Sequence, residues 1–206
     1  MNPDQRAEMN IIEQVKIRYA LPERYRSQAA RLYYGAFEQK LGALFGSQEH
    51  GIAILEKSFD PELAIVASWQ NQLVGLIGLQ YDNYCFVDLK PSSFAIEFGW
   101  LRGLYRFAHF LPLFQLPHKG ELVLDGVAVH ASMRGRGIGT RLLETACTFA
   151  WEGGFSTVSL EVVDTNLRAR RLYERIGFVP LKTQRCALLT HKMGFSASTK
   201  MVRRIK

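Results

Sequence analysis

Cysteine is scarce in this chain of 206 residues, which contains three: Cys85, Cys147 and Cys186. They are too few and too scattered for a disulfide scaffold or for a zinc site. We therefore expect a chain without a metal centre, suited to a reducing compartment.

Long apolar runs are also missing. No run approaches the roughly 20 residues that a membrane-spanning helix needs. The opening residues, Met1 to Arg6, contain no apolar stretch of the kind found in a secretory signal. These features predict a cytoplasmic protein with no transmembrane segment. The length suits one domain, 1–206, with a helical excursion at about 91–120.

Acidic residues are outnumbered, because 19 Asp and Glu accompany 26 Lys and Arg and the formal net charge is +7. Such an excess favours anionic partners, either nucleic acid or a ligand with several phosphates. Several arginines lie between Arg134 and Arg185, and we interpret the basic tail 200–206 as solvated and frayed. None of the motifs typical of nucleic-acid-binding folds is present, so we expect no nucleic-acid partner.

Hydrophobic periodicity and turn residues divide the chain into strands and helices. β-branched residues favour strands, and glycine or proline marks the ends of helices. The expected order is a strand at 10–19, a helical stretch from Pro22 to about Gly46, a helix at 48–58, a hairpin at 63–81, a strand at 121–129, a helix from Ile138 to Gly153, a strand at 157–163, a helix at 166–176, and strands near 178–184 and 186–193.

A glycine-rich loop, Arg134-Gly-Arg-Gly-Ile-Gly139, separates the strand at 121–129 from the next helix. Helix N-termini present unpaired N–H groups and partial positive charge, and glycines let the backbone approach an anion, so the loop suits a pyrophosphate. It departs from the dinucleotide-binding fingerprint at Thr140 and from the P-loop because Thr140-Arg141 replaces Lys-Ser/Thr. A plain turn that joins the strand to the helix is the alternative.

Two motifs around this loop resemble those of the Gcn5-related N-acetyltransferase (GNAT) superfamily. They are Arg134-x-x-Gly137-x-Gly139, preceded by Val127-Ala-Val129, and Asn166-x-x-Ala169-x-x-Leu172-Tyr173-x-x-x-Gly177-Phe178. The resemblance implies an α/β fold: a single GNAT-like domain with a mixed, mostly antiparallel central sheet. It also implies helices on both faces and strands that splay apart at the acetyl-CoA site.

The same resemblance implies how acetyl-CoA, the cosubstrate, is held. Loop amides would bind the pyrophosphate, and the strand before the loop would pair with the pantetheine arm. The Tyr173 hydroxyl would lie near the thioester sulfur and protonate the departing thiolate. The implied cofactor-binding residues are Val127, Ala128, Val129, Arg134, Gly135, Arg136, Gly137, Ile138, Gly139, Thr140, Asn166 and Tyr173.

A general base is needed as well, because a lysine-like amine has an ordinary pKa of about 10.4 and must lose its proton. The family often places Glu or His on the strand before the loop, at the position of Asp125 or two residues earlier. Val123 occupies the earlier position and cannot serve. Asp125 is therefore the leading candidate, directly or through a water, and Glu121 is the next carboxylate of the same strand parity. His130 faces the other way by parity.

Residues 91–120 do not match the family's minimal pattern. The part from 98 to 111 predicts an apolar-rich helix, ended by Pro112. Four interpretations stay open: a helix packed on the core, a wall over the acceptor site, a homodimer contact, and a membrane-surface helix, since such surfaces favour Trp, Phe and Arg.

The sequence thus predicts an N-acetyltransferase in which a primary amine attacks the thioester directly. No cysteine lies in the motifs, so no acyl-enzyme is expected. The alternative is a CoA-binding sensor or regulatory module of the same fold. Position 123, where the family often has an acidic residue, is occupied by Val123, and this absence is compatible with the alternative. The acceptor amine is not readable from the sequence.

Overall fold

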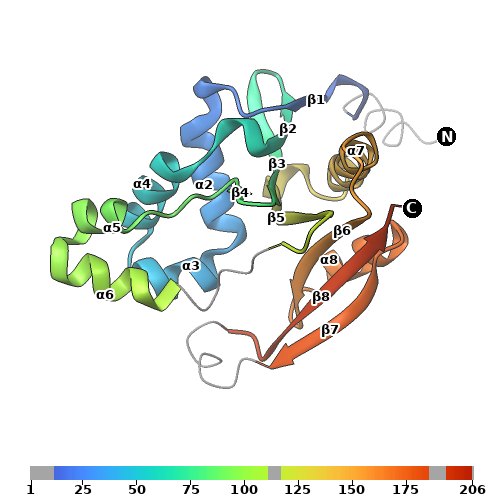
Figure 1. Cartoon of the computed structure of the whole chain (residues 1–206). Helices are drawn as coiled ribbons and strands as arrows, with labels where there is room; N and C mark the ends of the chain where they lie inside the picture. Colours follow the sequence, from blue (N-terminus) through green and yellow to red (C-terminus); the bar gives the residue numbers. More distant parts are fainter. Residues whose placement is uncertain (1–11, 111–116, 186–193, 206) are drawn as a thin grey trace.

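A computed structural model describes residues 12–110, 117–185 and 194–205. Its centre is one sheet in the order β1-β2-β3-β5-β6-β8-β7, with β4 attached to β3 (Figure 1). The β5–β6 pair is parallel, and the other pairs described are antiparallel. The strands are β1 Lys16–Tyr19, β2 Ala64–Trp69, β3 Gln72–Tyr81, β4 Tyr84–Cys85, β5 Glu121–Val129, β6 Thr157–Val163, β7 Val179–Arg185 and β8 Ala197–Arg204.

Helices cover the sheet on both faces, with α7 on one side and α2 on the other, and α4 packs against α2 (Figure 1). The expected α/β fold class is therefore confirmed. The α-helices are α2 Arg26–Ala36, α3 Glu38–Phe45, α4 Gln48–Ser58, α5 Pro91–Phe98, α6 Trp100–Phe110, α7 Ile138–Glu152 and α8 Leu167–Arg175; short 3-10 turns are Glu23–Tyr25, Pro61–Leu63 and Ala131–Met133. Among the described residues, no helix is both long enough and apolar enough to cross a bilayer.

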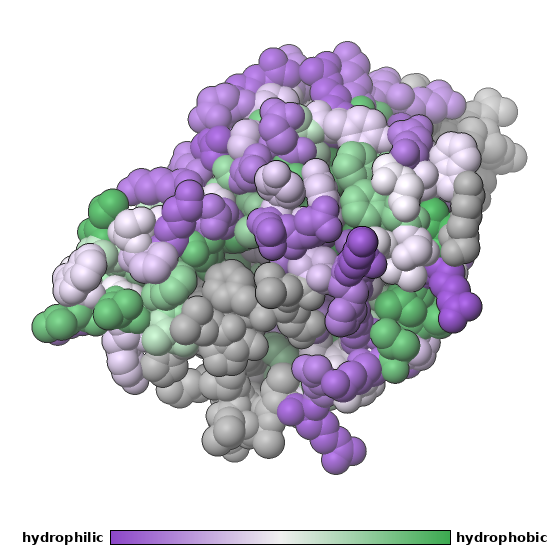
Figure 2. Space-filling model, viewed as in Figure 1, coloured by the Kyte–Doolittle hydropathy of each residue, from purple (hydrophilic) through white to green (hydrophobic). Residues whose placement is uncertain are grey.

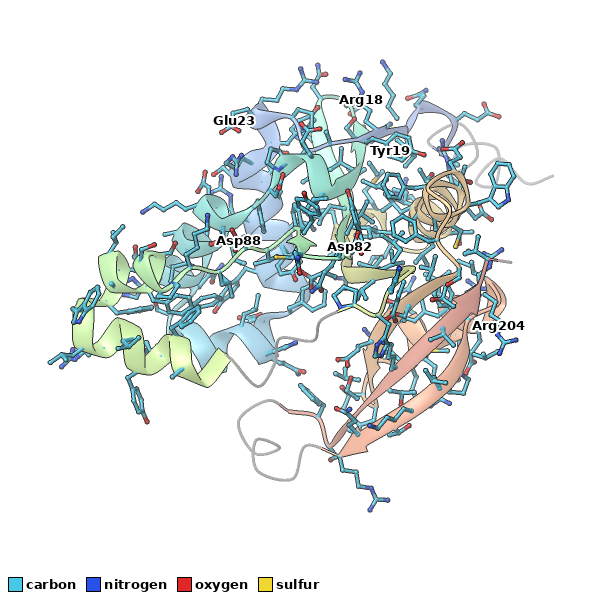
Figure 3. The ribbon with its side chains drawn as sticks, in the orientation of Figure 1. Arg18, Tyr19, Glu23, Asp82, Asp88 and Arg204 are labelled. Carbon is cyan, nitrogen blue, oxygen red and sulfur yellow. The ribbon has the colours of Figure 1, made fainter. Side chains whose placement is uncertain are left out.

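Local sequence accounts for most of these elements. In α7 the apolar residues recur at helical spacing and are buried, as in Leu142, Leu143 and Ala146. The β2–β3 hairpin turns at Gln70 and Asn71, which both have positive φ, as the central residues of a type I′ turn require. The edge strand β1 is held beside α7, where the ring of Tyr19 lies 5.9 Å from that of Phe149 (Figure 3).

The predictions at the two ends of the chain need correction. The strand expected at 10–19 is limited to β1, because Ile12–Gln14 is helical. The strand expected at 186–193 falls outside the described residues. The tail expected to be frayed instead forms β8, which lies between β6 and β7. Met201 is fully buried while its neighbours on the strand are partly exposed. Buried and exposed side chains therefore alternate as in a strand, and the many basic residues made this alternation hard to recognise in the sequence.

The helix expected at 98–111 is present as α6, and a helix that was not expected, α5, precedes it; Gly99 separates the two. This glycine has φ of +78°, a backbone conformation that interrupts a right-handed helix and that glycine adopts without strain. Pro91 starts α5 at its first turn, where proline's missing N–H costs nothing.

Candidate active site

The strands β5 and β6 separate halfway along β5. Residues Glu121 to Leu124 pair with Thr157 to Leu160, and pairing between these two strands ends there. From Val127 to Val129, β5 stays paired with β3 on its other side. The edge of β5 that faces β6 is therefore not paired with β6 over these residues, which suits an extended ligand.

A β-bulge lies where the two strands separate. Ile77 pairs with Val127 and Leu79 pairs with Leu124, so Asp125 and Gly126 together oppose the single residue Gly78. Gly126 has φ of +90°, and a β-carbon there would lie 2.8 Å from the ring of Phe37, which joins α2 to α3. Bulges re-aim side chains and are common beside active sites. Because the bulge breaks the alternation of side chains along β5, the orientation of His130 does not follow from that of Asp125 by strand parity.

Asp125 sits in the bulge next to Tyr33 of α2. The buried Tyr33 hydroxyl donates a hydrogen bond to Asp125 Oδ1 at 3.3 Å. Burial raises the pKa of Asp125 above its usual range, while the charge of Lys40 and the Tyr33 hydrogen bond oppose this rise. A carboxylate with a raised pKa is a stronger proton acceptor than an exposed one. Tyr33 was missed from the sequence because helical periodicity marks it as a core residue.

Glu121 has different surroundings. It is 5% exposed, its Oε1 lies 2.6 Å from Lys200 Nζ, and its Oε2 accepts a hydrogen bond from the His118 amide at 2.9 Å. Burial raises its pKa, but Lys200 and the hydrogen bonds outweigh burial, so the net shift is downward. Glu121 lies four residues before Asp125, about 13 Å along an extended strand. Both carboxylate oxygens of Glu121 are therefore occupied, one by Lys200 of β8 and the other by the backbone at His118.

The glycine-rich loop leads from β5 into α7. Gly135 and Gly137 have φ of +85° and +78°, and Gly137 caps the helix without a side chain. The amides of Ile138, Gly139 and Thr140 therefore lie in the first turn of α7, where a helix leaves its N–H groups without intrahelical acceptors. The helix dipole adds partial positive charge at this end. The loop has the properties of an anion cradle.

Two arginines of this region fix the backbone. Arg134 Nε donates to the Val129 carbonyl at 3.1 Å. Arg141 Nη1 donates to the carbonyls of Ile12 and Val15 at 2.6 and 3.1 Å. These bonds hold the loop and the segment before β1 in place. Arg136, the third, is partly exposed between the two glycines.

Helix α8 packs against the same loop. A β-carbon on Gly139 would lie 3.2 Å from Leu172 Cδ2, and one on Gly135 would lie 3.3 Å from Arg168 Nη2. The fold thus brings the two sequence motifs together and adds a cationic side chain, that of Arg168, beside the loop. Asn166 caps α8, because its side chain accepts a hydrogen bond from the Ala169 amide at 3.1 Å. That bond gives Asn166 a structural role alongside the predicted contact with CoA.

Tyr173 projects from α8 and is 6% exposed, with its ring 6.2 Å from that of Phe178. Burial raises the pKa of Tyr173 to about 12. The phenol is therefore protonated at neutral pH and can act as a donor. Among the residues that the structure describes, its hydroxyl has no side-chain hydrogen bond. His130, by contrast, is exposed. Its Nδ1 lies 2.8 Å from Ser132 Oγ, so the imidazole ring hydrogen-bonds to a residue two positions along the chain.

A sheet whose parallel pair opens beside a glycine-rich helix N-terminus is the arrangement of an acyl-CoA-dependent transferase. The chain belongs to the acetyltransferase (GNAT) family, whose sequence model matches residues 31–178. The resemblance seen in the two motifs is therefore confirmed at the level of the family.

Individual relatives agree with this assignment. A stretch of 72 residues is 36% identical to the probable N-acetyltransferase camello of Xenopus tropicalis; it covers 35% of this chain and 33% of that protein, so the match spans about a third of its length. An N-acetyltransferase from Staphylococcus aureus superimposes with a TM-score of 0.62 at 18% identity, over 91% of this chain and 100% of that one. The ribosomal-protein-S18-alanine N-acetyltransferase of Escherichia coli gives 0.57 at 17%, over 93% and 94%. At these identities, the two structures establish the fold.

Proposed function

We propose that this protein transfers the acetyl group of acetyl-CoA to a primary amine by direct attack. The observation that carries the proposal is the opening of β5 from β6 immediately before the anion cradle. A ligand with a pyrophosphate and an amide-bearing arm would find both halves of its binding site in consecutive segments. Membership of the acetyltransferase family supports the same reaction.

Cofactor binding is assigned to the loop and to the open edge of β5. Gly135, Gly137, Gly139 and Thr140 would present amides to the pyrophosphate. Val127, Ala128 and Val129 would pair with the pantetheine arm as an added strand does. Arg136 and Arg168 would add positive charge beside the phosphates, and Asn166 would contribute its amide group.

The chemistry is divided between two side chains and the backbone. Bound acetyl-CoA supplies a thioester carbonyl that the neutral amine attacks. Asp125 would accept the amine's proton, directly or through a water, and backbone N–H groups of the open edge would stabilise the oxyanion. Tyr173 would donate its proton to the departing thiolate and regain one from solvent. Glu121, with both oxygens engaged, is the weaker candidate for the base.

Binding and turnover can be tested separately. Acetyl-CoA at a hundredfold excess over its Kd should stabilise the native state by about 2.7 kcal/mol and raise the melting temperature. Dephospho-CoA should give a weaker shift if the basic residues of α8 contact the 3′-phosphate. No shift with any CoA species would refute cofactor binding.

Turnover is tested with a panel of acceptors and mass detection of the acetylated product. The panel should contain polyamines, aminoglycosides, lysine peptides and peptides with free N-termini. A product with at least one amine is expected. A regulatory CoA-binding module, the alternative that Val123 suggests, would give the thermal shift and no product with any amine.

A further inference from the structure

Helix α6 has an apolar face that the core does not use. Its inner face packs against α5: a β-carbon on Gly103 would lie 2.5 Å from the Phe94 carbonyl oxygen, and the Phe107 ring lies 5.6 Å from that of Phe94. Its outer face carries Leu101, Leu104 and Tyr105 at helical spacing, and all three are exposed. The exposed face of a globular helix is normally polar, so folding alone does not explain these residues.

Two more residues extend this face into one patch, which we call the outer patch: Ile96, Trp100, Leu101, Leu104 and Tyr105. Trp100 is 74% exposed and Leu101 is 83% exposed. Figure 2 shows apolar side chains along the outer edge of α5 and α6, and Figure 1 places this edge at the end of the molecule farthest from β6 to β8. The patch is therefore on a projecting corner.

The base of the projecting corner is well packed. Phe94 is fully buried and stacks on Phe45 of α3 with ring centroids 5.8 Å apart. The Arg106 guanidinium lies over the Phe98 ring at 4.6 Å. Because the inner face is fixed in this way, the outer patch is presented as a preformed surface.

Helix α6 is positively charged. It contains Arg102 and Arg106 and no Asp or Glu, and Arg102 is exposed beside the patch residues. The preceding acid, Glu97, lies 2.7 Å from His50 Nδ1. Farther back, Asp88 lies on the segment that leads from β4 into α5 (Figure 3) and forms an ion pair with Lys90 at 3.1 Å.

We propose that the outer patch docks the protein on an anionic membrane surface, with α6 lying in the plane of the headgroups. Trp100 and Tyr105 would seat their rings at the headgroup level, Leu101 and Leu104 would enter the acyl boundary, and Arg102 would contact lipid phosphate. A second copy of the chain fits less well, because an isologous contact would bring two Arg102 side chains into one small apolar interface.

The test is cosedimentation of the full-length protein with vesicles of phosphatidylcholine, with and without phosphatidylglycerol, at low and high salt. Wild type should bind the anionic vesicles and lose binding as salt increases. Leu101→Glu should weaken partitioning by about tenfold or more, since it removes an inserted side chain and adds a repelled charge. Leu181→Glu, an equally nonconservative change at an exposed leucine of β7, is the matched control and should bind as wild type does.

Three results would overturn the proposal. One is the absence of wild-type binding to anionic vesicles. Another is equal binding by Leu101→Glu and wild type. The third is a dimer in sedimentation velocity that Leu101→Glu dissociates, since the outer patch would then be an interface between copies. The CoA-induced thermal shift of each variant checks that the variant is folded, independently of vesicle binding.

Discussion

Each half of β5 carries one carboxylate, and the surroundings of the two carboxylates shift their pKa values in opposite directions. Glu121 lies in the half closed by β6, where Lys200 and the His118 amide overcome the effect of burial and lower its pKa. Asp125 lies in the open half, where burial prevails over Lys40 and Tyr33 and raises its pKa. A carboxylate fully engaged with cations and amides stabilises the fold, whereas one buried with a single donor retains the basicity that proton transfer needs.

The bulge between the two halves is the structural cause of this difference. It adds one residue to β5 opposite Gly78, and the pairing with β6 ends at the residue before it. One strand can therefore complete the sheet at its start and serve as a binding edge at its end. Substitutions in each half of β5, and in the loop that follows it, can break this division.

Gly137→Val should have the largest effect and abolish acetyl-CoA binding. Valine is strained at φ of +78°, and its side chain would occupy the space that a phosphate oxygen would take at this helix N-terminus. The measurement is the thermal shift with acetyl-CoA. Gly154→Val is the matched control, because Gly154 has φ of +72° with open space around it at the other end of α7. Wild-type CoA affinity in a folded Gly137→Val protein would contradict the loop assignment.

Asp125→Asn should lower kcat/KM by about 10²–10⁴-fold, the usual range for removing a general base. The amide still accepts the Tyr33 hydrogen bond, so the bulge should persist and CoA binding should change little. Glu121→Gln, in the closed half, is the comparison and should keep nearly normal turnover of the same amine. Equal losses in both variants would remove the functional distinction between the halves.

Tyr173→Phe should lower kcat by about 10²-fold, at the low end of the acid–base range, because a thiol with a pKa of about 8.5 is already a fair leaving group. The ring remains, so acetyl-CoA affinity should be unchanged. Tyr34→Phe, another buried tyrosine of the core, controls for loss of a phenol. Normal kcat with chemistry rate-limiting would make Tyr173 a packing residue.

Much of this arrangement could be predicted from the sequence. The stripe of α7 and the β-branched residues of β6 identify their elements through periodicity alone. The two motifs predict that the loop and α8 contribute to one site, and the fold brings Gly139 within contact of Leu172. Local signals were enough here because strand, loop and helix follow directly in the chain.

The rest depends on contacts between distant segments. Asp125-Gly126 was a visible bulge signal, since glycine inside a strand often marks one, but its partner Gly78 could not be identified without the β3–β5 register. Tyr33 is 92 residues from Asp125 in sequence. β8 was missed because its lysine and arginines alternate with the buried residues Thr199 and Met201, so that the segment has the composition of a charged tail.

Glu121→Gln should lower the free energy of unfolding at neutral pH by about 1–2 kcal/mol, since it replaces a charge-assisted contact with a neutral one. Because the folded-state pKa of Glu121 is lowered, its contribution is present above the unfolded-state pKa and is lost as pH falls through the folded-state value. The variant should therefore lose less stability than wild type on acidification. Urea denaturation at several pH values measures this, and parallel curves would contradict it.

Tyr33→Phe should have the smallest effect and should act on pH dependence alone. The Tyr33 hydrogen bond favours the ionised form of Asp125, so its removal should raise the pKa of Asp125 further. A base works when ionised, and the acid limb of kcat/KM should therefore move to higher pH while the plateau is kept. The ring stays packed 4.8 Å from Phe37, so the fold should not change. A limb that moves to lower pH, or a lowered plateau with an unmoved limb, would show that Tyr33 does not act through the ionisation of Asp125.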